Sequence, residues 1–130
     1  MDPAKYIGIP FVPLGRDKNE GLDCYGLMRE LAKDNGHPLP DYEYEGNTDN
    51  VFALNFHKSV FEIDEADRQA GDVVVLEYPV QGGIHIGMLI NRNEFIHTTR
   101  KTGVVIGRLS DQVVARRIKG FYRIKENADG

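Results

Sequence analysis

In this 130-residue chain, one segment with the apolar spacing of an amphipathic helix precedes a series of apolar runs that are typical of strands. Apolar side chains recur at the i, i+3, i+4 and i+7 spacing of an amphipathic helix, at Cys24, Leu27, Met28 and Leu31. Asp23 is a favourable N-cap residue, and Gly36 followed by Pro38 is a typical helix stop. The pattern therefore predicts a helix from about Asp23 to Asn35.

Apolar runs separated by Gly, Asn and Asp follow this helix. The runs span residues 73–78, 84–90, 94–99, 104–106 and 120–124. A connector with helical character over residues 110–116 precedes the last run, and residues 51–58 fit a short helix capped by Asp49 or Asn50. One helix followed by an antiparallel meander predicts an α+β fold, in which the helix packs on a sheet of about five strands.

The length and composition fit one domain over residues 1–130. Glycine and proline punctuate an N-terminal segment over residues 1–21, which we expect to be extended, and residues 126–130 form a short polar tail, which we expect to be flexible. No stretch approaches the ~20 apolar residues of a membrane helix, and the N-terminus lacks the apolar run of a signal peptide. We therefore expect no membrane partner and no secretion signal.

The charge is acidic overall but unevenly distributed. The net charge of −4 argues against nucleic acid as a partner. Between Arg100 and Lys125, however, eight residues are basic and only Asp111 is acidic. This basic stretch is interpreted either as solvated strand and loop faces or as a wall that faces an anionic ligand or an acidic neighbouring subunit.

Cys24 is the only cysteine, so the fold cannot depend on an internal disulfide. It lies where a loop is predicted to become a helix. The unpaired N–H groups and the positive dipole end of a helix start favour a thiolate over a thiol, and the thiolate is the nucleophilic form. The competing interpretation is that Cys24 is a small core residue on the apolar face of the helix.

Two of the four histidines are candidates for a base beside this thiol. His37 follows the helix stop and His57 lies beside a lysine, so both are predicted to lie on the surface. His85 and His97 lie in consecutive predicted strands, which should pair and direct both rings to one region. A cysteine hydrolase needs such a base and a group that orients it. A structural zinc site needs four closely spaced ligands, so we expect no metal and no cofactor.

Several short motifs together resemble the NlpC-type cell-wall peptidases, a papain-like family of cysteine endopeptidases. The matching segments are Gly21–Leu27, Ala70–Val74, Ile84–Gly87, Phe95–His97 and Gly103–Val105. They correspond in chain order to the family's Asp-Cys-Ser-Gly-Leu motif, its Gly-Asp turn, its His-Val-Gly motif, the strand with the third catalytic residue, and the element after it. The resemblance covers roughly residues 6–124.

This resemblance implies the role of each candidate residue. Cys24 would be the nucleophile, His85 the general base and later the acid, and His97 the group that orients the His85 ring. The backbone N–H of Cys24 would help to bind the oxyanion. Further contacts to the oxyanion or substrate are implied for Asp23, Tyr25 and Phe11. The implied activity is cleavage of peptidoglycan stem peptides, at a bond of the D-glutamyl–diaminopimelate type.

Two positions depart from the family's usual residues. Tyr25 stands where the family has Ser, and Phe11 stands where it often has Tyr. An aromatic residue after the cysteine and the segment Gly8-Ile9-Pro10 are similar to shorter variants found in phage tail proteins. We therefore expect a component of the phage tail tip, made in the host cytoplasm, located in the virion and partnered by other tail-tip proteins.

Two alternatives remain open from the sequence. The departures at Phe11 and Tyr25 also suit a catalytically weak or inactive structural module of a tail tip. An amidase or an acyltransferase on the same scaffold is the third hypothesis. The basic stretch from Arg100 to Lys125 would suit the anionic stem peptides in the endopeptidase hypothesis.

Overall fold

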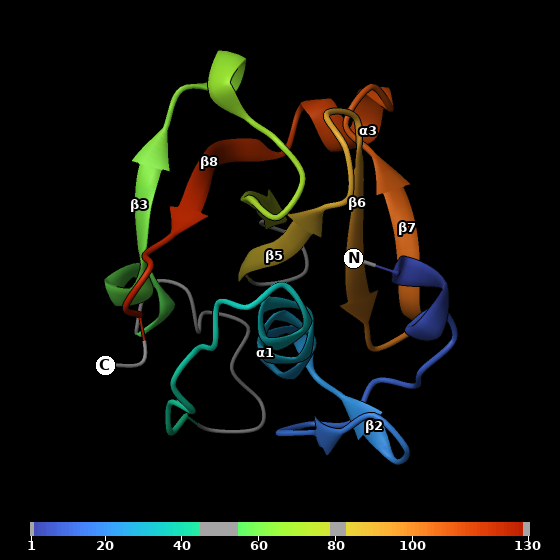
Figure 1. The fold of residues 1–130 in the computed structure, drawn as a ribbon. Coiled ribbons are helices and arrows are strands. Elements are labelled where there is room, and N and C mark those ends of the chain that lie inside the picture. The colour runs from blue at the N-terminus through green and yellow to red at the C-terminus, as the bar shows by residue number, and fades with distance from the viewer. Residues whose placement is uncertain (1, 45–54, 79–82, 129–130) are drawn as a thin grey trace.

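A computed structural model describes residues 2–44, 55–78 and 83–128 (Figure 1). The helices are α1 (Cys24–Asp34) and the short α3 (Gln112–Ala115). The strands are β1 (Arg16–Asp17), β2 (Gly21–Leu22), β3 (Val60–Ile63), β4 (Val73–Tyr78), β5 (Gly83–Leu89), β6 (Glu94–Thr99), β7 (Gly103–Arg108) and β8 (Ile118–Ile124). Single 3-10 turns occur at Pro3–Lys5, Phe56–Ser59 and Glu65–Asp67. In the described part of the chain, no helix is long and apolar enough to cross a membrane.

Helix α1 confirms the helix that was predicted from the spacing of apolar residues. The carboxylate of its N-cap, Asp23, accepts a hydrogen bond from the Gly26 N–H at 2.7 Å. The side chains of the stripe are buried against the sheet at Leu27, Met28 and Leu31. The helix ends at Asp34 with Asn35 as its C-cap, and Gly36 follows with a φ of 80°, a left-handed conformation that glycine adopts without a steric penalty.

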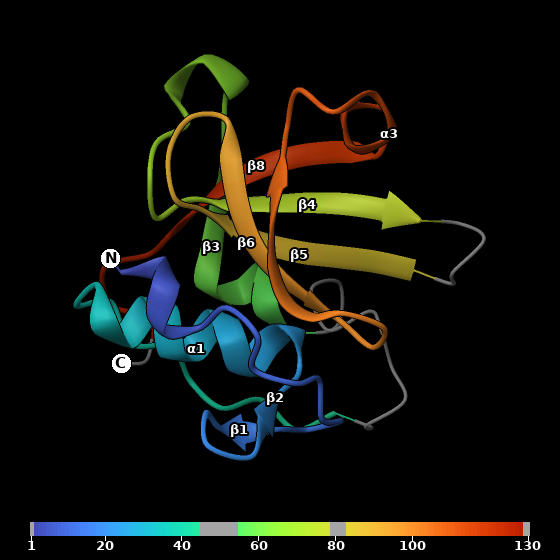
Figure 2. The same cartoon turned by 90° about the vertical axis from the view of Figure 1, so that its right-hand side faces the viewer.

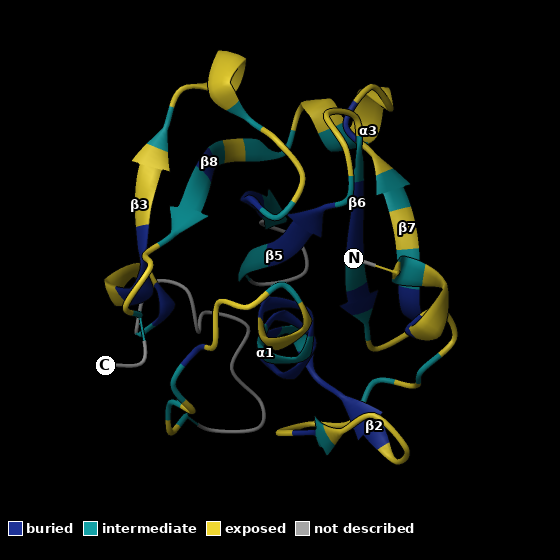
Figure 3. Cartoon of the chain, viewed as in Figure 1, coloured by how far each residue is buried: buried dark blue, intermediate teal, exposed yellow. Residues whose placement is uncertain are grey.

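The main sheet confirms the α+β fold and corrects its strand order. Six strands pair in the order β3-β8-β4-β5-β6-β7, and every pairing is antiparallel. Strands β4 to β7 form the predicted meander, but β8 returns to the free edge of β4 and carries β3 on its other side. The expectation of about five strands missed β3. This strand has four residues and lies at the edge of the sheet with Phe61 and Glu62 exposed, so it lacks a periodic signal (Figure 3).

Apolar layers cover both faces of the sheet. Helix α1 lies against β5 and β6 on one face, where its buried side chains meet Ile86, Met88 and Ile96 (Figure 2). The alternate residues Leu89 and Phe95 belong to a second cluster with Leu76 and other apolar side chains. Alternation along β5 and β6 therefore decides which residues contact the helix and which face the other layer.

The N-terminal segment is tied to both the sheet and the helix start. The Val104 N–H donates to the Ile9 carbonyl at 2.9 Å, and the Leu22 N–H donates to the Pro10 carbonyl at 3.0 Å. The expected extended segment also contains the β1–β2 hairpin, which the sequence did not predict. These bonds hold the loop before α1 close to the start of β7.

The remaining expected elements differ in outcome. The helical connector is confirmed as α3. Residues 51–54 of the expected short helix, together with both proposed caps, lie outside the described residues. The part that the structure describes is the 3-10 turn Phe56–Ser59.

Candidate active site

Cys24 is the first residue of α1 and is half-buried. Its position confirms that the cysteine lies at a helix start, where the dipole and unpaired N–H groups stabilise an anion. Cys24 also packs at the margin of the core cluster under the sheet. The first turn of α1, the start of β5 and the end of β6 lie toward the same side of the molecule (Figure 2).

His85 on β5 and His97 on β6 are in direct contact. The Nε2 atom of His85 lies 2.7 Å from the Nδ1 atom of His97. The ring centroids are 4.9 Å apart and the ring planes are inclined by 75°. The prediction that pairing of the two strands would direct both rings to one region is confirmed.

Glycine makes room for this histidine pair. A Cβ atom at Gly87 would lie 2.8 Å from Phe95 and 3.3 Å from the Cβ of His97. A Cβ atom at Gly107, on the neighbouring strand β7, would lie 3.3 Å from the Nε2 of His97 and 2.6 Å from Phe95. Because side chains are missing at both positions, there is room for the His97 ring beside the backbone of both strands.

Burial keeps both histidines neutral. Burial, and then the neighbouring His97, lowers the pKa of His85 from 6.5 to about 3. Burial lowers the pKa of His97 to about 4. At neutral pH each ring therefore has one donor and one acceptor nitrogen. If His85 donates from Nε2 to His97, its Nδ1 has a free electron pair and is the basic atom.

Asp23 occupies a buried and fully bonded position. Its residue exposure is 4%, and its carboxylate accepts hydrogen bonds from the Gly26 N–H, from Arg16 and from the Tyr44 hydroxyl. The Asp23 carboxylate is therefore engaged by groups of the protein itself, where it caps the start of α1. A contact from Asp23 to the oxyanion or substrate stays a prediction. Sequence reasoning missed Arg16 and Tyr44, because residues so far apart in the chain share no local pattern.

The two aromatic candidates lie in different surroundings. The side chain of Tyr25 is fully buried, and its hydroxyl donates to the Pro40 carbonyl at 2.6 Å. Its ring packs on those of Tyr42, Tyr44 and Phe56. Only the backbone of Tyr25 is therefore left for a substrate contact. Phe11 is half-buried, and the Arg100 guanidinium lies 4.8 Å from its ring centroid. Contacts from either residue to the substrate stay predictions.

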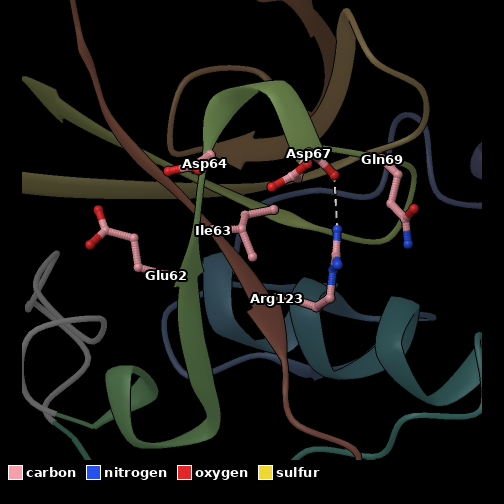
Figure 4. Close-up of a pocket in the computed structure, with 6 residues that line it drawn as sticks. All are labelled: Glu62, Ile63, Asp64, Asp67, Gln69 and Arg123. Carbon is pink, nitrogen blue, oxygen red and sulfur yellow. Dashed lines mark hydrogen bonds between the residues drawn. The ribbon is translucent and has the colours of Figure 1, made fainter.

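Two hollows on the surface lie away from these residues. One is an open, mainly acidic depression at β3 and β8, where Arg123 donates to the Asp67 carbonyl (Figure 4). Its lining residues are Glu62, Ile63, Asp64, Asp67, Gln69 and Arg123. The other adjoins the C-terminal end of α1 at Ala32 and Asn35. Neither hollow is lined by the cysteine or by the histidine pair.

The basic stretch has many partners within the chain. Arg123 forms an ion pair with the buried Asp72, Lys119 lies 3.1 Å from Glu77, and Arg117 lies over the Tyr78 ring. These contacts favour the interpretation that this part of the basic stretch forms ordinary solvated strand and loop faces. No group of three or more His, Cys, Asp or Glu side chains in the described ranges is arranged to hold a metal ion. His37 and His57 are exposed, as predicted.

Comparisons with known proteins relate the whole arrangement to one family. The model of the NlpC/P60 family matches residues 8–123. The chain is 26% identical over 112 residues to the murein DD-endopeptidase MepS/murein LD-carboxypeptidase of Escherichia coli (strain K12), covering 85% of this chain and 54% of that protein. It is 27% identical over 125 residues to the gamma-DL-glutamyl hydrolase of Bacillus subtilis (strain 168), covering 95% of this chain and 28% of that protein. The chain thus spans about half the length of the first relative and less of the second.

Solved structures share the fold. A lipoprotein-like NLP/P60 family protein of Staphylococcus aureus superposes with a TM-score of 0.71 at 25% identity, covering 96% of this chain and 39% of that one. The NlpC/p60 domain of the peptidoglycan hydrolase SagA superposes with a TM-score of 0.60 at 20% identity, covering 95% of this chain and 92% of that domain.

Proposed function

The chain belongs to the NlpC/P60 family, and from this premise we propose that it is a cysteine endopeptidase that cleaves stem peptides of peptidoglycan. The observation that carries the proposal is the 2.7 Å contact between His85 and His97, on strands that pack against the helix that Cys24 begins. A base, an orienting group and a thiol at a helix start are the three parts of a cysteine hydrolase.

The histidine pair determines how the proton moves in this mechanism. His85 Nδ1 takes the proton of the Cys24 thiol, and the thiolate attacks the carbonyl carbon of the scissile peptide bond. His97 Nδ1 accepts a hydrogen bond from the Nε2–H group of His85 and stabilises the imidazolium that forms. The oxyanion of the tetrahedral intermediate is bound partly by the Cys24 backbone N–H at the helix start.

The second half of the reaction regenerates the enzyme. His85 gives its proton to the leaving amine, and the C–N bond breaks to leave a thioester on Cys24. His85 then takes a proton from water, which attacks the thioester carbonyl. Collapse of this second intermediate breaks the C–S bond, releases the carboxylate product and returns the proton to the thiol.

We propose a γ-D-glutamyl–diaminopimelate bond as the target within the stem peptide. The sequence motifs support this choice, and the similar Bacillus subtilis protein is named as a gamma-DL-glutamyl hydrolase. Mass spectrometry of the fragments released from purified peptidoglycan would test it. We expect a new free amine on diaminopimelate. Fragments cut between D-alanine and diaminopimelate would contradict the bond and leave the hydrolase assignment intact, whereas a glycan freed from its whole stem peptide would indicate an amidase.

We also propose that the protein acts in the tip of a phage tail. The support is Tyr25 directly after the cysteine and the segment Gly8-Ile9-Pro10 near the start, both similar to tail-associated variants. Immunogold labelling of purified phage particles that encode the chain would test the proposal. We expect label at the tail tip, and particles that lack label while the cell envelope is labelled would overturn it.

A further inference from the structure

A buried carboxylate belongs to the residue immediately before the proposed nucleophile in the chain. Asp23 precedes Cys24 in the chain and is 4% exposed. Burying a carboxylate is costly unless hydrogen bonds and an opposite charge compensate it. A negative charge next to a thiol also opposes loss of the thiol proton. The structure must therefore offset the charge of Asp23 if Cys24 is to react as a thiolate.

Arg16, on strand β1, supplies the opposite charge. Its Nη1 atom lies 2.9 Å from the Oδ1 atom of Asp23 and also donates to the Gly15 carbonyl. Its Nη2 atom donates to the Tyr44 hydroxyl at 2.7 Å, and that hydroxyl donates to the second carboxylate oxygen of Asp23. Arg16 and Tyr44 thus bind the carboxylate from two sides. Burial, and then the hydrogen bond to Asp23, raises the pKa of Tyr44, so its hydroxyl stays a donor.

Close backbone packing holds Arg16 against the first turn of the helix. A Cβ atom at Gly26 would lie 2.1 Å from the Gly15 carbonyl oxygen and 3.2 Å from the Arg16 Nη1. Only a residue without a side chain fits there. The guanidinium also lies 5.7 Å from the Tyr25 ring centroid and 5.3 Å from that of Tyr44. The helix start and the β1–β2 hairpin are therefore one packed unit.

We propose that Arg16 is a positioning residue for the reaction: it holds the Asp23 carboxylate as the helix cap and offsets its charge beside Cys24. The proposal rests on the proposed role of Cys24 as nucleophile. It assigns to a side chain of the N-terminal hairpin a role in the reactivity of the thiol. Without Arg16, the Asp23 carboxylate would lose its ion-pair partner, and we expect the thiolate of Cys24 to be harder to form.

Other titratable groups around this unit come from three directions. The segment after α1 brings Asp41, whose Oδ1 lies 2.9 Å from the Arg16 Nε and which is half-exposed. Helix α1 itself brings Arg29, 3.8 Å from the other oxygen of Asp41. Strands β5 and β6 pack on α1 and carry His85 and His97, whose rings contact each other. Of these groups, only Arg16 is within ion-pair distance of Asp23.

The pH dependence of Cys24 alkylation tests the proposal directly, because the protein has no other cysteine. The rate of carbamidomethylation by iodoacetamide, followed by intact mass, gives the pH midpoint of thiolate formation. We expect Arg16→Gln to raise this midpoint by about one pH unit. Arg16→Lys, which keeps the charge, should recover at least half of the shift. Arg29→Gln is the matched control and should leave the midpoint within about 0.2 units of the wild type.

A double variant separates the charge effect from a loss of structure. Because Arg16 acts on the charge of Asp23, the shift caused by Arg16→Gln should vanish in the Asp23→Asn background. Thermal melting of each variant shows whether it is folded. An unchanged midpoint in Arg16→Gln, or equal shifts with and without the Asp23 charge, would overturn the proposal.

Failure of the proposed function gives a different pattern. In that case the wild-type midpoint would lie near 8.5, the value of an ordinary thiol, and peptidoglycan would stay intact. The difference between the wild type and Arg16→Gln would still be measurable. The two proposals can therefore fail separately.

Discussion

The Nε2 atom of His85 and the Nδ1 atom of His97 lie 2.7 Å apart, although the residues are 12 positions apart in the chain. Pairing of β5 with β6 brings the two rings to one face, and Gly87 leaves space beside His97. This contact fixes the orientation of the His85 ring and uses its Nε2 atom. In the proposed mechanism, the other ring nitrogen of His85, Nδ1, takes the proton of the Cys24 thiol.

The proposed orienting role of His97 predicts graded losses of activity. We expect His97→Leu to lower kcat/KM on the order of 100-fold, because the imidazolium of His85 loses its acceptor. His97→Asn can retain an acceptor oxygen and should lose on the order of 10-fold. Release of free amino groups from purified peptidoglycan measures both. Equal activity of wild type and His97→Leu would exclude the role.

The two buried histidines predict that acid destabilises the fold. Burial lowers the pKa of both rings below the 6.5 of an unfolded chain. Above pH 6.5 the rings are neutral in both states. As the pH falls from 6.5 toward 4, the unfolded chain binds protons that the folded chain resists, so the free energy of unfolding decreases. We expect a decrease of roughly 1–3 kcal/mol from this pair.

Urea unfolding at several pH values measures this slope. A variant with glutamine at both positions, His85→Gln with His97→Gln, should show a flatter dependence between pH 6.5 and 4. The exposed His37 serves as the control, and His37→Gln should keep the wild-type slope. Parallel curves for the double variant and the wild type would count against the buried pair as the cause.

Close packing of the hairpin on α1 predicts that Gly26 tolerates no side chain. The Cβ of Gly26→Ala would lie 2.1 Å from the backbone oxygen of Gly15. We expect a loss of roughly 1–3 kcal/mol in the free energy of unfolding, because the backbone must shift. Gly120→Ala is the matched change, since its Cβ would meet its neighbours at 3.4 Å or more. It should change stability by less than about 1 kcal/mol. Similar melting temperatures for both variants would contradict this packing.

The ion pair between Arg123 and Asp72 predicts a loss of stability without a loss of catalysis. Both contacts between the two side chains are 2.9 Å long, and the Asp72 side chain is 3% exposed. Arg123→Ala would leave this carboxylate buried and unpaired, at a cost of roughly 3–5 kcal/mol. Lys119→Ala on the same strand breaks an exposed pair and should cost less than about 1 kcal/mol.

Activity below the melting temperature is the second measurement on these two variants. We expect kcat/KM of Arg123→Ala to stay near the wild-type value, because its partner Asp72 and the hollow it lines are away from Cys24 and the histidine pair. A large loss of activity in the folded variant would instead indicate that this part of the basic stretch binds substrate.

Local patterns predicted the elements that carry the candidate site. The spacing of apolar residues gave α1 to within a residue at each end, and the turns gave β4 and β6 with the bounds that the structure has. The shared position of His85 and His97 followed from the short turn between their strands. These features depend on residues close in sequence, where periodicity and turn chemistry are strong signals.

Long-range pairings were not predictable in the same way. Strand β8 pairs with β4 and β3, which lie far from it in the chain. Nothing in the local sequence of β8 specifies these two partners. The contact of Arg16 with Asp23 and Tyr44 likewise joins residues separated by 7 and 28 positions. Burial of the Tyr25 side chain could not be predicted from the local sequence for the same reason, because its packing partners come from the segment after α1.

The role of Cys24 as the nucleophile is tested by the rate at which purified peptidoglycan releases free amino groups, compared between the wild type and Cys24→Ala. Because Cys24 is the nucleophile in this account, we expect release by the wild type and none above background by Cys24→Ala, with both proteins melting at similar temperatures. A wild-type protein no more active than Cys24→Ala would contradict the claim and favour a structural module of the tail tip. Equal release by both proteins would show that another group performs the hydrolysis.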